Sequence, residues 1–237
     1  MRILVALNSA LILLCVTAVH AQRPVTPFEE RKVRALLRTE LACLGCHALE
    51  GSGGRTAVTL DSIGVRRSEA WIRGMIEDPQ RTMPGAAMPR ARMPEATREL
   101  LVRFLLRQGA RAAATPASAP APSTARTDPP PVAVDGATLY GRWCASCHGA
   151  AGRGDGPNAA YLPVRPVAHT DATLIGRRSD DALFDAIAGG GVVMGRSARM
   201  PAFGATLSPV AIRALVAQVR AFCRCDGPAW SHDPVRR

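Results

Sequence analysis

The chain has 237 residues, and its 30 lysines and arginines outnumber its 19 aspartates and glutamates, which gives a formal net charge of +11. This length allows one large or two small domains. Aromatic residues make up only 4% of the chain, and no stacking platform for single-stranded nucleic acid is visible. The basic charge therefore favours docking to acidic protein partners over nucleic-acid binding. A simple compositional bias toward arginine is the alternative explanation.

The first 21 residues have the three parts of a secretory signal peptide. Arg2 precedes an apolar run over residues 3–19, and small residues end the segment at Ala21. The run is short for a bilayer span, although an uncleaved anchor is the alternative. We predict that residues 1–21 are removed and that the mature chain is periplasmic, with no membrane span.

A stretch rich in alanine, proline, serine and threonine divides the remaining chain. Residues 109–134 have no periodic apolar pattern, which predicts a semi-rigid linker that lets the two sides move. The two domains then span residues 22–108 and 135–226, and a C-terminal tail follows at 227–237. Each half repeats one plan: a short helix, Cys-x-x-Cys-His, a glycine-rich loop, a short helix, Met-Pro and an amphipathic helix.

Apolar periodicity predicts helices in both halves, and no strand-like alternation is evident, so the fold class is all-α. The last helix of the first half begins at a proline and is expected to stop at Gly109. The predicted helices, in chain order, cover residues 28–41, 71–77, 94–108, 136–144 and 209–222.

Two Cys-x-x-Cys-His motifs carry the chemistry of this chain, and this pattern is the attachment signature of c-type haem. Two thiols one helical turn apart can bond to both vinyl groups of one porphyrin, and the adjacent imidazole reaches the iron. A thioredoxin-like redox pair would need a βαβ setting, and a zinc site would need closer cysteine pairs. We therefore predict two covalent haem c groups, held by Cys43, Cys46 and His47, and by Cys144, Cys147 and His148.

A methionine commonly supplies the sixth iron ligand opposite such a histidine, and it raises the reduction potential. In the second half we predict Met200, with Met194 as the rival. The first half has three Met-Pro pairs, and the tight turn before Met88 favours it over Met83 and Met93. The proline after each ligand would stiffen the loop that holds a weak thioether on the iron.

Both halves resemble class I cytochrome c domains, and the whole chain resembles a dihaem cytochrome c. The second half carries the more specific match, in Gly149, the loop 152–157 and the prolines Pro163 and Pro166. The resemblance implies two tandem domains, each wrapped around one covalent haem. It also implies that Pro163 or Pro166 borders the haem on its histidine side.

The resemblance further implies helix-crossing positions and a propionate contact. Gly136 and Tyr140 sit where the family crosses its first and last helices, whereas the first half departs from the pattern with Ala35 and Thr39. Val58 stands where a proline near the histidine is usual. Arg177 or Arg178 is the implied propionate partner.

Several reactive side chains remain outside these motifs. Cys223 and Cys225 have two alternatives, a strained disulfide with each other or pairing with a partner chain, and no function is assigned to them. His169 and His232 are expected to be solvated. Trp71 either covers the edge of the first haem or is a core tryptophan.

An iron with both histidine and methionine ligands has no open position, so these features favour electron transfer. We predict a carrier, or the cytochrome subunit of an oxidoreductase, that passes electrons from a dehydrogenase-type donor to a downstream acceptor. The alternative is a dihaem enzyme that oxidises sulfur compounds or reduces peroxide at one open or labile haem. A gas sensor is a third hypothesis, and it needs an open iron too.

Overall fold

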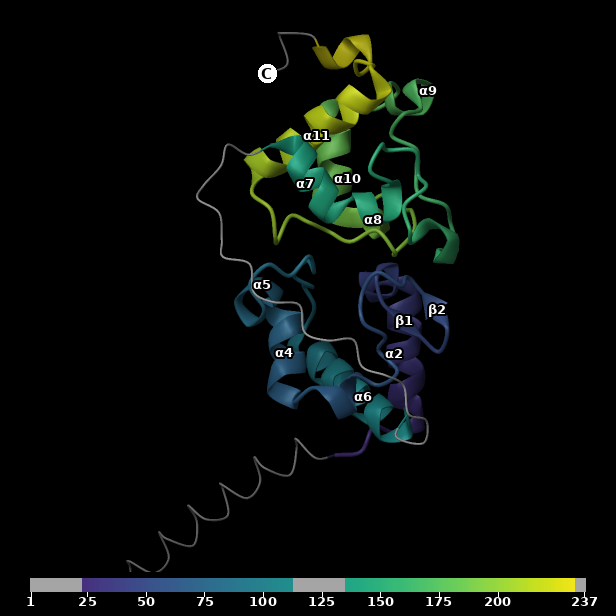
Figure 1. Cartoon of the computed structure of the whole chain (residues 1–237), viewed down its shortest axis with the longest axis vertical. Helices are drawn as coiled ribbons and strands as arrows, with labels where there is room; N and C mark the ends of the chain where they lie inside the picture. Colours follow the sequence, from purple (N-terminus) through teal and green to yellow (C-terminus); the bar gives the residue numbers. More distant parts are fainter. Residues whose placement is uncertain (1–22, 113–134, 233–237) are drawn as a thin grey trace, which may run out of the picture.

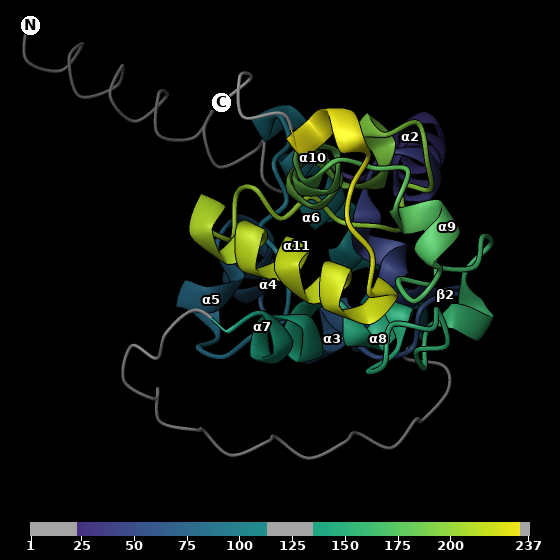
Figure 2. The same cartoon turned by 90° about the horizontal axis from the view of Figure 1, so that it is seen from above.

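The computed structural model describes residues 23–112 and 135–232, which form two helical domains stacked along the long axis (Figure 1). Seen from above, the second domain covers the first (Figure 2). The predicted signal peptide at 1–21 lies outside the described residues, and so does the predicted linker from residue 113 onward.

The first domain places its final helix, α6, against three other helices, α2, α3 and α4. Its buried core includes Val33 and Leu37 from α2 and Val102 and Phe104 from α6. The elements of this domain are α2 (Pro27–Thr39), η1 (Ala42–Gly45), β1 (Ala48–Leu49), β2 (Ser52–Gly53), α3 (Ile63–Arg66), α4 (Glu69–Glu77), α5 (Pro79–Thr82) and α6 (Glu95–Ala112).

The start of α2 is fixed by a capping box. Thr26 caps the helix by accepting the backbone N–H of Glu29, and the carboxylate of Glu29 accepts the backbone N–H of Thr26 at 2.8 Å. Each side chain satisfies a donor that the helix leaves free. The same carboxylate accepts from the guanidinium of Arg103 at 3.1 Å, so this cap also ties α2 to α6.

Helix α6 continues past Gly109 to Ala112, which corrects the predicted stop of this helix. Gly109 lies inside α6 and contacts the backbone of α3. A Cβ atom at Gly109 would lie 2.1 Å from the amide nitrogen of Val65, and one at Gly64 would lie 2.4 Å from the carbonyl oxygen of Leu106. The glycine is needed for close packing rather than for helix termination.

The second domain packs its first helix, α7, against its last long helix, α11. A Cβ atom at Gly136 would lie 2.3 Å from the carbonyl oxygen of Ala214, and the ring of Tyr140 meets Phe222 edge-on at 4.8 Å. The elements are α7 (Gly136–Trp143), α8 (Ala145–His148), η2 (Ala159–Tyr161), α9 (Ala172–Ile175), α10 (Asp180–Val193), α11 (Pro209–Cys223) and η3 (Ala229–His232). In the first domain the two helices that cross at close range are α3 and α6.

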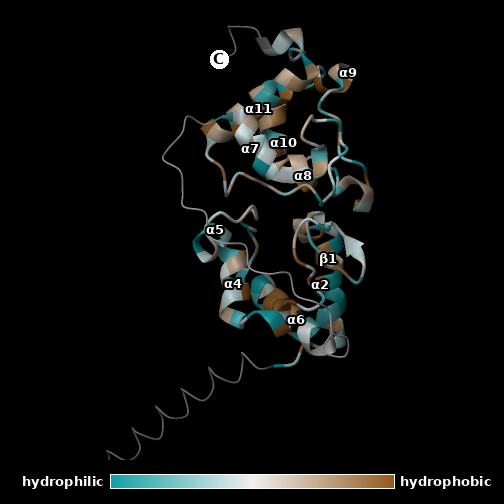
Figure 3. Ribbon diagram, in the orientation of Figure 1, coloured by the Kyte–Doolittle hydropathy of each residue, from teal (hydrophilic) through white to brown (hydrophobic). Residues whose placement is uncertain are grey.

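Helices dominate the described residues, and the pair of two-residue strands β1 and β2 is a small antiparallel hairpin after the first motif. Apolar residues gather on the inner faces of the helices, most clearly on α6 (Figure 3). Within the described ranges, no helix is long and apolar enough to cross a membrane.

Candidate functional site

The first Cys-x-x-Cys-His motif begins in the short helix η1 and ends at His47. The Nδ1 atom of His47 lies 2.7 Å from the carbonyl oxygen of Val58. A carbonyl only accepts hydrogen bonds, so Nδ1 carries the proton and Nε2 keeps a free lone pair. Burial lowers the pKa of His47. A neutral imidazole with free Nε2 is the form that binds a metal.

The second motif repeats this arrangement at the end of α8. The Nδ1 atom of His148 lies 2.9 Å from the carbonyl oxygen of Val167, and burial lowers the pKa of His148. Val167 directly follows Pro166, one of the two prolines that the resemblance places on the histidine side. Both histidines therefore have the same tautomer and the same free nitrogen.

The four motif cysteines are free thiols. Burial raises the pKa of Cys43 to about 11, that of Cys46 to about 11 and that of Cys144 to about 12. The described residues contain no group of three or more His, Cys, Asp or Glu side chains that could hold a metal ion. The donor set in each domain fits one covalent haem: two thiols for the vinyl groups and one imidazole for the iron.

The predicted ligand loop of the first domain lies between α5 and α6. The side-chain amide of Gln80 donates to the carbonyl oxygen of Met88 at 2.6 Å, which holds the backbone of Met88 in place. Met83 is 45% exposed, and Met93 packs against the hydrophobic core. The choice of Met88 over Met83 and Met93 as the iron ligand stays a prediction.

The predicted ligand loop of the second domain packs against the kinked end of α10. Gly190 has a φ of 74°, and the backbone N–H of Gly191 donates to the carbonyl oxygen of Met200 at 3.0 Å. Further along the loop, Phe203 donates its N–H to the carbonyl oxygen of Ile187. Backbone bonds thus hold the loop at Met200 and at Phe203, whereas Met194 is the C-cap residue of α10.

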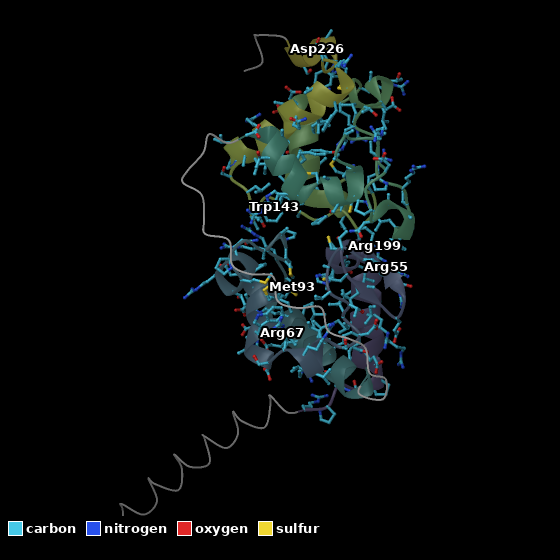
Figure 4. The ribbon with its side chains drawn as sticks, in the orientation of Figure 1. Arg55, Arg67, Met93, Trp143, Arg199 and Asp226 are labelled. Atoms are coloured by element: carbon cyan, nitrogen blue, oxygen red, sulfur yellow. A yellow bond between two sulfur atoms is a disulfide. The ribbon has the colours of Figure 1, made fainter. Side chains whose placement is uncertain are left out.

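The two motifs meet at the contact between the domains, where Arg55 and Arg199 lie (Figure 4). Asn158 of the second domain donates to the carbonyl oxygen of Gly45 at 3.1 Å, and the Cys147 sulfur lies 4.0 Å from the same oxygen. The linker composition predicts domains that move relative to each other. The structure instead joins them at their haem-attachment loops, a contact that no sequence periodicity indicates.

Side chains outside the two haem-attachment motifs confirm some of the predictions from the sequence and contradict others. Cys223 and Cys225 form a disulfide with each other, so pairing with a partner chain is wrong. His169 is not solvated as expected: its ring stacks on His148 at 4.2 Å, and its Nδ1 atom lies 2.9 Å from the hydroxyl of Tyr140. Trp71 packs partly buried against the core of the first domain, as the core interpretation predicts.

The fold and the site of the second domain define a cytochrome c domain that binds haem covalently. Residues 131–218 match the family model described as cytochrome C oxidase, cbb3-type, subunit III. No curated protein matches the chain, and no solved structure matches it. The chain thus contains a c-type cytochrome domain over these residues, and this domain implies haem binding and electron transfer.

Proposed function

We propose that the chain is a periplasmic dihaem cytochrome that carries electrons between a dehydrogenase-type donor and a downstream acceptor, either freely or as a subunit of an oxidoreductase. One observation carries the proposal. Both domains hold a Cys-x-x-Cys-His histidine by the same hydrogen bond, from Nδ1 to the carbonyl of Val58 or Val167. This bond fixes the imidazole in the tautomer that binds iron.

The protein's own residues would supply attachment and ligation at both sites. Cys43 and Cys46 would hold one haem and Cys144 and Cys147 the other, through thioether bonds. His47 and Met88 would bind one iron, and His148 and Met200 would bind the other. Bound haem supplies the one-electron change between ferrous and ferric iron. Methionine opposite histidine raises the potential and leaves no free position for a substrate.

The proposal is tested on the mature protein by measuring the haem content per chain and the spectrum of the reduced form with and without carbon monoxide. We expect two covalent haems and an unchanged spectrum, because every iron position is filled. One haem per chain would contradict the dihaem part. A change in the spectrum on adding carbon monoxide would contradict one of the two methionine assignments. It would support the alternative, an enzyme that oxidises sulfur compounds or reduces peroxide.

The partners and the location belong to the same proposal. The first 21 residues predict export, and export would bring the chain to periplasmic redox proteins. An arginine-rich surface would steer partners with acidic docking faces, because opposite charges raise the rate of encounter.

A further inference from the structure

The glycine-rich loop of the second domain inserts one side chain, Asn158, into the first domain. Asn158 is 0% exposed. Its Oδ1 atom accepts the backbone N–H groups of Arg55 at 2.8 Å and Thr56 at 3.2 Å. Its Nδ2 atom donates to the carbonyl of Gly45 at 3.1 Å and to the hydroxyl of Thr56 at 2.7 Å. All four hydrogen-bonding positions of the amide are thus used across the domain contact.

A buried amide is stable only when its partners are in place, because burial removes the water that would otherwise bind it. Any slip or rotation of one domain against the other would leave Asn158 and the Arg55 and Thr56 amides without partners. A fully satisfied polar network of this kind selects one arrangement among the many that apolar surfaces allow.

Two glycines allow the loops to come this close. A Cβ atom at Gly45 would lie 2.3 Å from the carbonyl oxygen of Arg199 in the other domain. One at Gly54 would lie 2.3 Å from the carbonyl oxygen of Gly45 and 3.0 Å from the side-chain carbon Cγ of Asn158. The two distances of 2.3 Å are far below a normal contact. The domain contact therefore needs a glycine at Gly45, and the loop that receives Asn158 needs one at Gly54.

Each predicted ligand loop also touches the opposite domain. The guanidinium of Arg199, which directly precedes Met200, donates to the carbonyl oxygen of Leu37 at 2.7 Å. In the other direction, the N–H of Arg90, two residues after the predicted ligand of the first domain, donates to the hydroxyl of Thr206 at 2.9 Å. Docking therefore holds both methionine loops.

We infer that Asn158 is a positioning residue that locks the docked domains and, through that docking, keeps both methionine loops in place. The two haem centres then form one redox unit rather than two independent units on a linker. The inference rests on the proposed function, because it concerns irons that take methionine ligands.

The test replaces Asn158 with leucine in the mature, haem-loaded protein, since leucine has a similar size and no hydrogen-bonding group. Both haems stay attached, because the cysteines are unchanged. We expect the backbone amides of Arg55 and Thr56 to exchange hydrogen about tenfold faster. We also expect the absorption band of methionine-ligated ferric haem to weaken and carbon monoxide binding to appear. Arg153→Ala in the same loop is the control, because the Arg153 side chain is 64% exposed and pairs with Asp155 of its own loop.

A second variant opens the contact without touching Asn158. Gly45→Ala places a methyl group against the Arg199 backbone, whereas Gly141→Ala, with no atom within 4 Å of its new Cβ, is the matched control. Gly45→Ala is expected to speed amide exchange and weaken the methionine band, as Asn158→Leu does, and Gly141→Ala is expected to change neither.

The outcomes separate this inference from the proposed function. Two haems per chain together with wild-type exchange and wild-type ligation in both test variants would overturn the positioning role of Asn158. Faster exchange with unchanged ligation would also overturn it, because docking would then not hold the methionine loops. Fewer than two haems in the unsubstituted protein would instead refute the dihaem function, and the exchange measurement would still report on docking.

Discussion

Two histidines of the second domain, one of them in the Cys-x-x-Cys-His motif, form a stacked pair. His148 donates from Nδ1 to a backbone carbonyl and keeps Nε2 free, whereas His169 stacks on its ring and bonds through Nδ1 to Tyr140. Burial, and then the neighbouring His148, lowers the pKa of His169 to about 3. A neutral ring packed flat against the ligand restricts how far that ligand can rotate.

The ligand assignment in the first domain is tested by replacing single methionines. Met88→Ala is expected to open one iron, so about half of the haem absorbance shifts with carbon monoxide, and the potential of that haem falls because the thioether is lost. Met83→Ala is the control, because Met83 is 45% exposed and the iron should stay closed. A shift in the control but not in the test variant would make Met83 the ligand.

Helix ends and helix crossings set the stability of the scaffold around these ligands. The sequence predicts most helix positions well, because caps and apolar stripes are local signals: α7 is expected at 136–144 and observed at Gly136–Trp143. The predicted helix end at Gly109 is wrong. This glycine contacts α3, which lies far away in the sequence. A local rule for helix termination cannot distinguish these two uses of glycine.

The crossing of α7 and α11 gives a prediction at this scale. Gly136→Ala would press a methyl group against the Ala214 carbonyl and should lower the free energy of unfolding by about 1–3 kcal/mol. Gly141→Ala in the same helix meets no atom within 4 Å and should raise it by about 1 kcal/mol, since alanine favours helix. Urea unfolding of the two variants measures both values. Equal changes in the free energy of unfolding would mean that helix propensity, and not the close contact between α7 and α11, determines the effect of both substitutions.

The cap of α2 should make the free energy of unfolding depend on pH. The backbone N–H of Thr26 and then the guanidinium of Arg103 lower the pKa of Glu29 from 4.5 to about 2. The folded state thus prefers the charged form, so this stabilisation is present above pH 4.5 and is lost as the pH falls toward about 2. Glu29→Gln removes the titrating group, and its unfolding free energy should fall less steeply than that of the wild type over this window. Parallel curves would contradict the lowered pKa of Glu29 in the folded state.

The sequence predicts two domains, but it does not predict how they pack against each other. Repeated motifs and a proline-rich stretch predict the duplication, because both are patterns along the chain. The contact of Asn158 with Arg55 and Thr56 joins residues about a hundred positions apart. One asparagine in a loop has no periodicity, so its burial could be recognised only once both domains were placed.

The net charge leads to a prediction for the whole protein. Arg2 is the only charged residue among the first 21, so removal of the predicted signal peptide would leave a formal charge of +10, which haem propionates would partly offset. Raising the salt concentration from about 10 mM to about 150 mM shortens the Debye length from about 30 Å to about 8 Å and screens this charge. Stopped-flow reduction by an anionic reagent should therefore slow with salt, whereas reduction by a cationic reagent should speed up. An uncharged reagent is the control and should react at one rate throughout. If the anionic and cationic reagents show the same salt dependence, the net charge does not steer encounter, and acidic docking partners lose their physical basis.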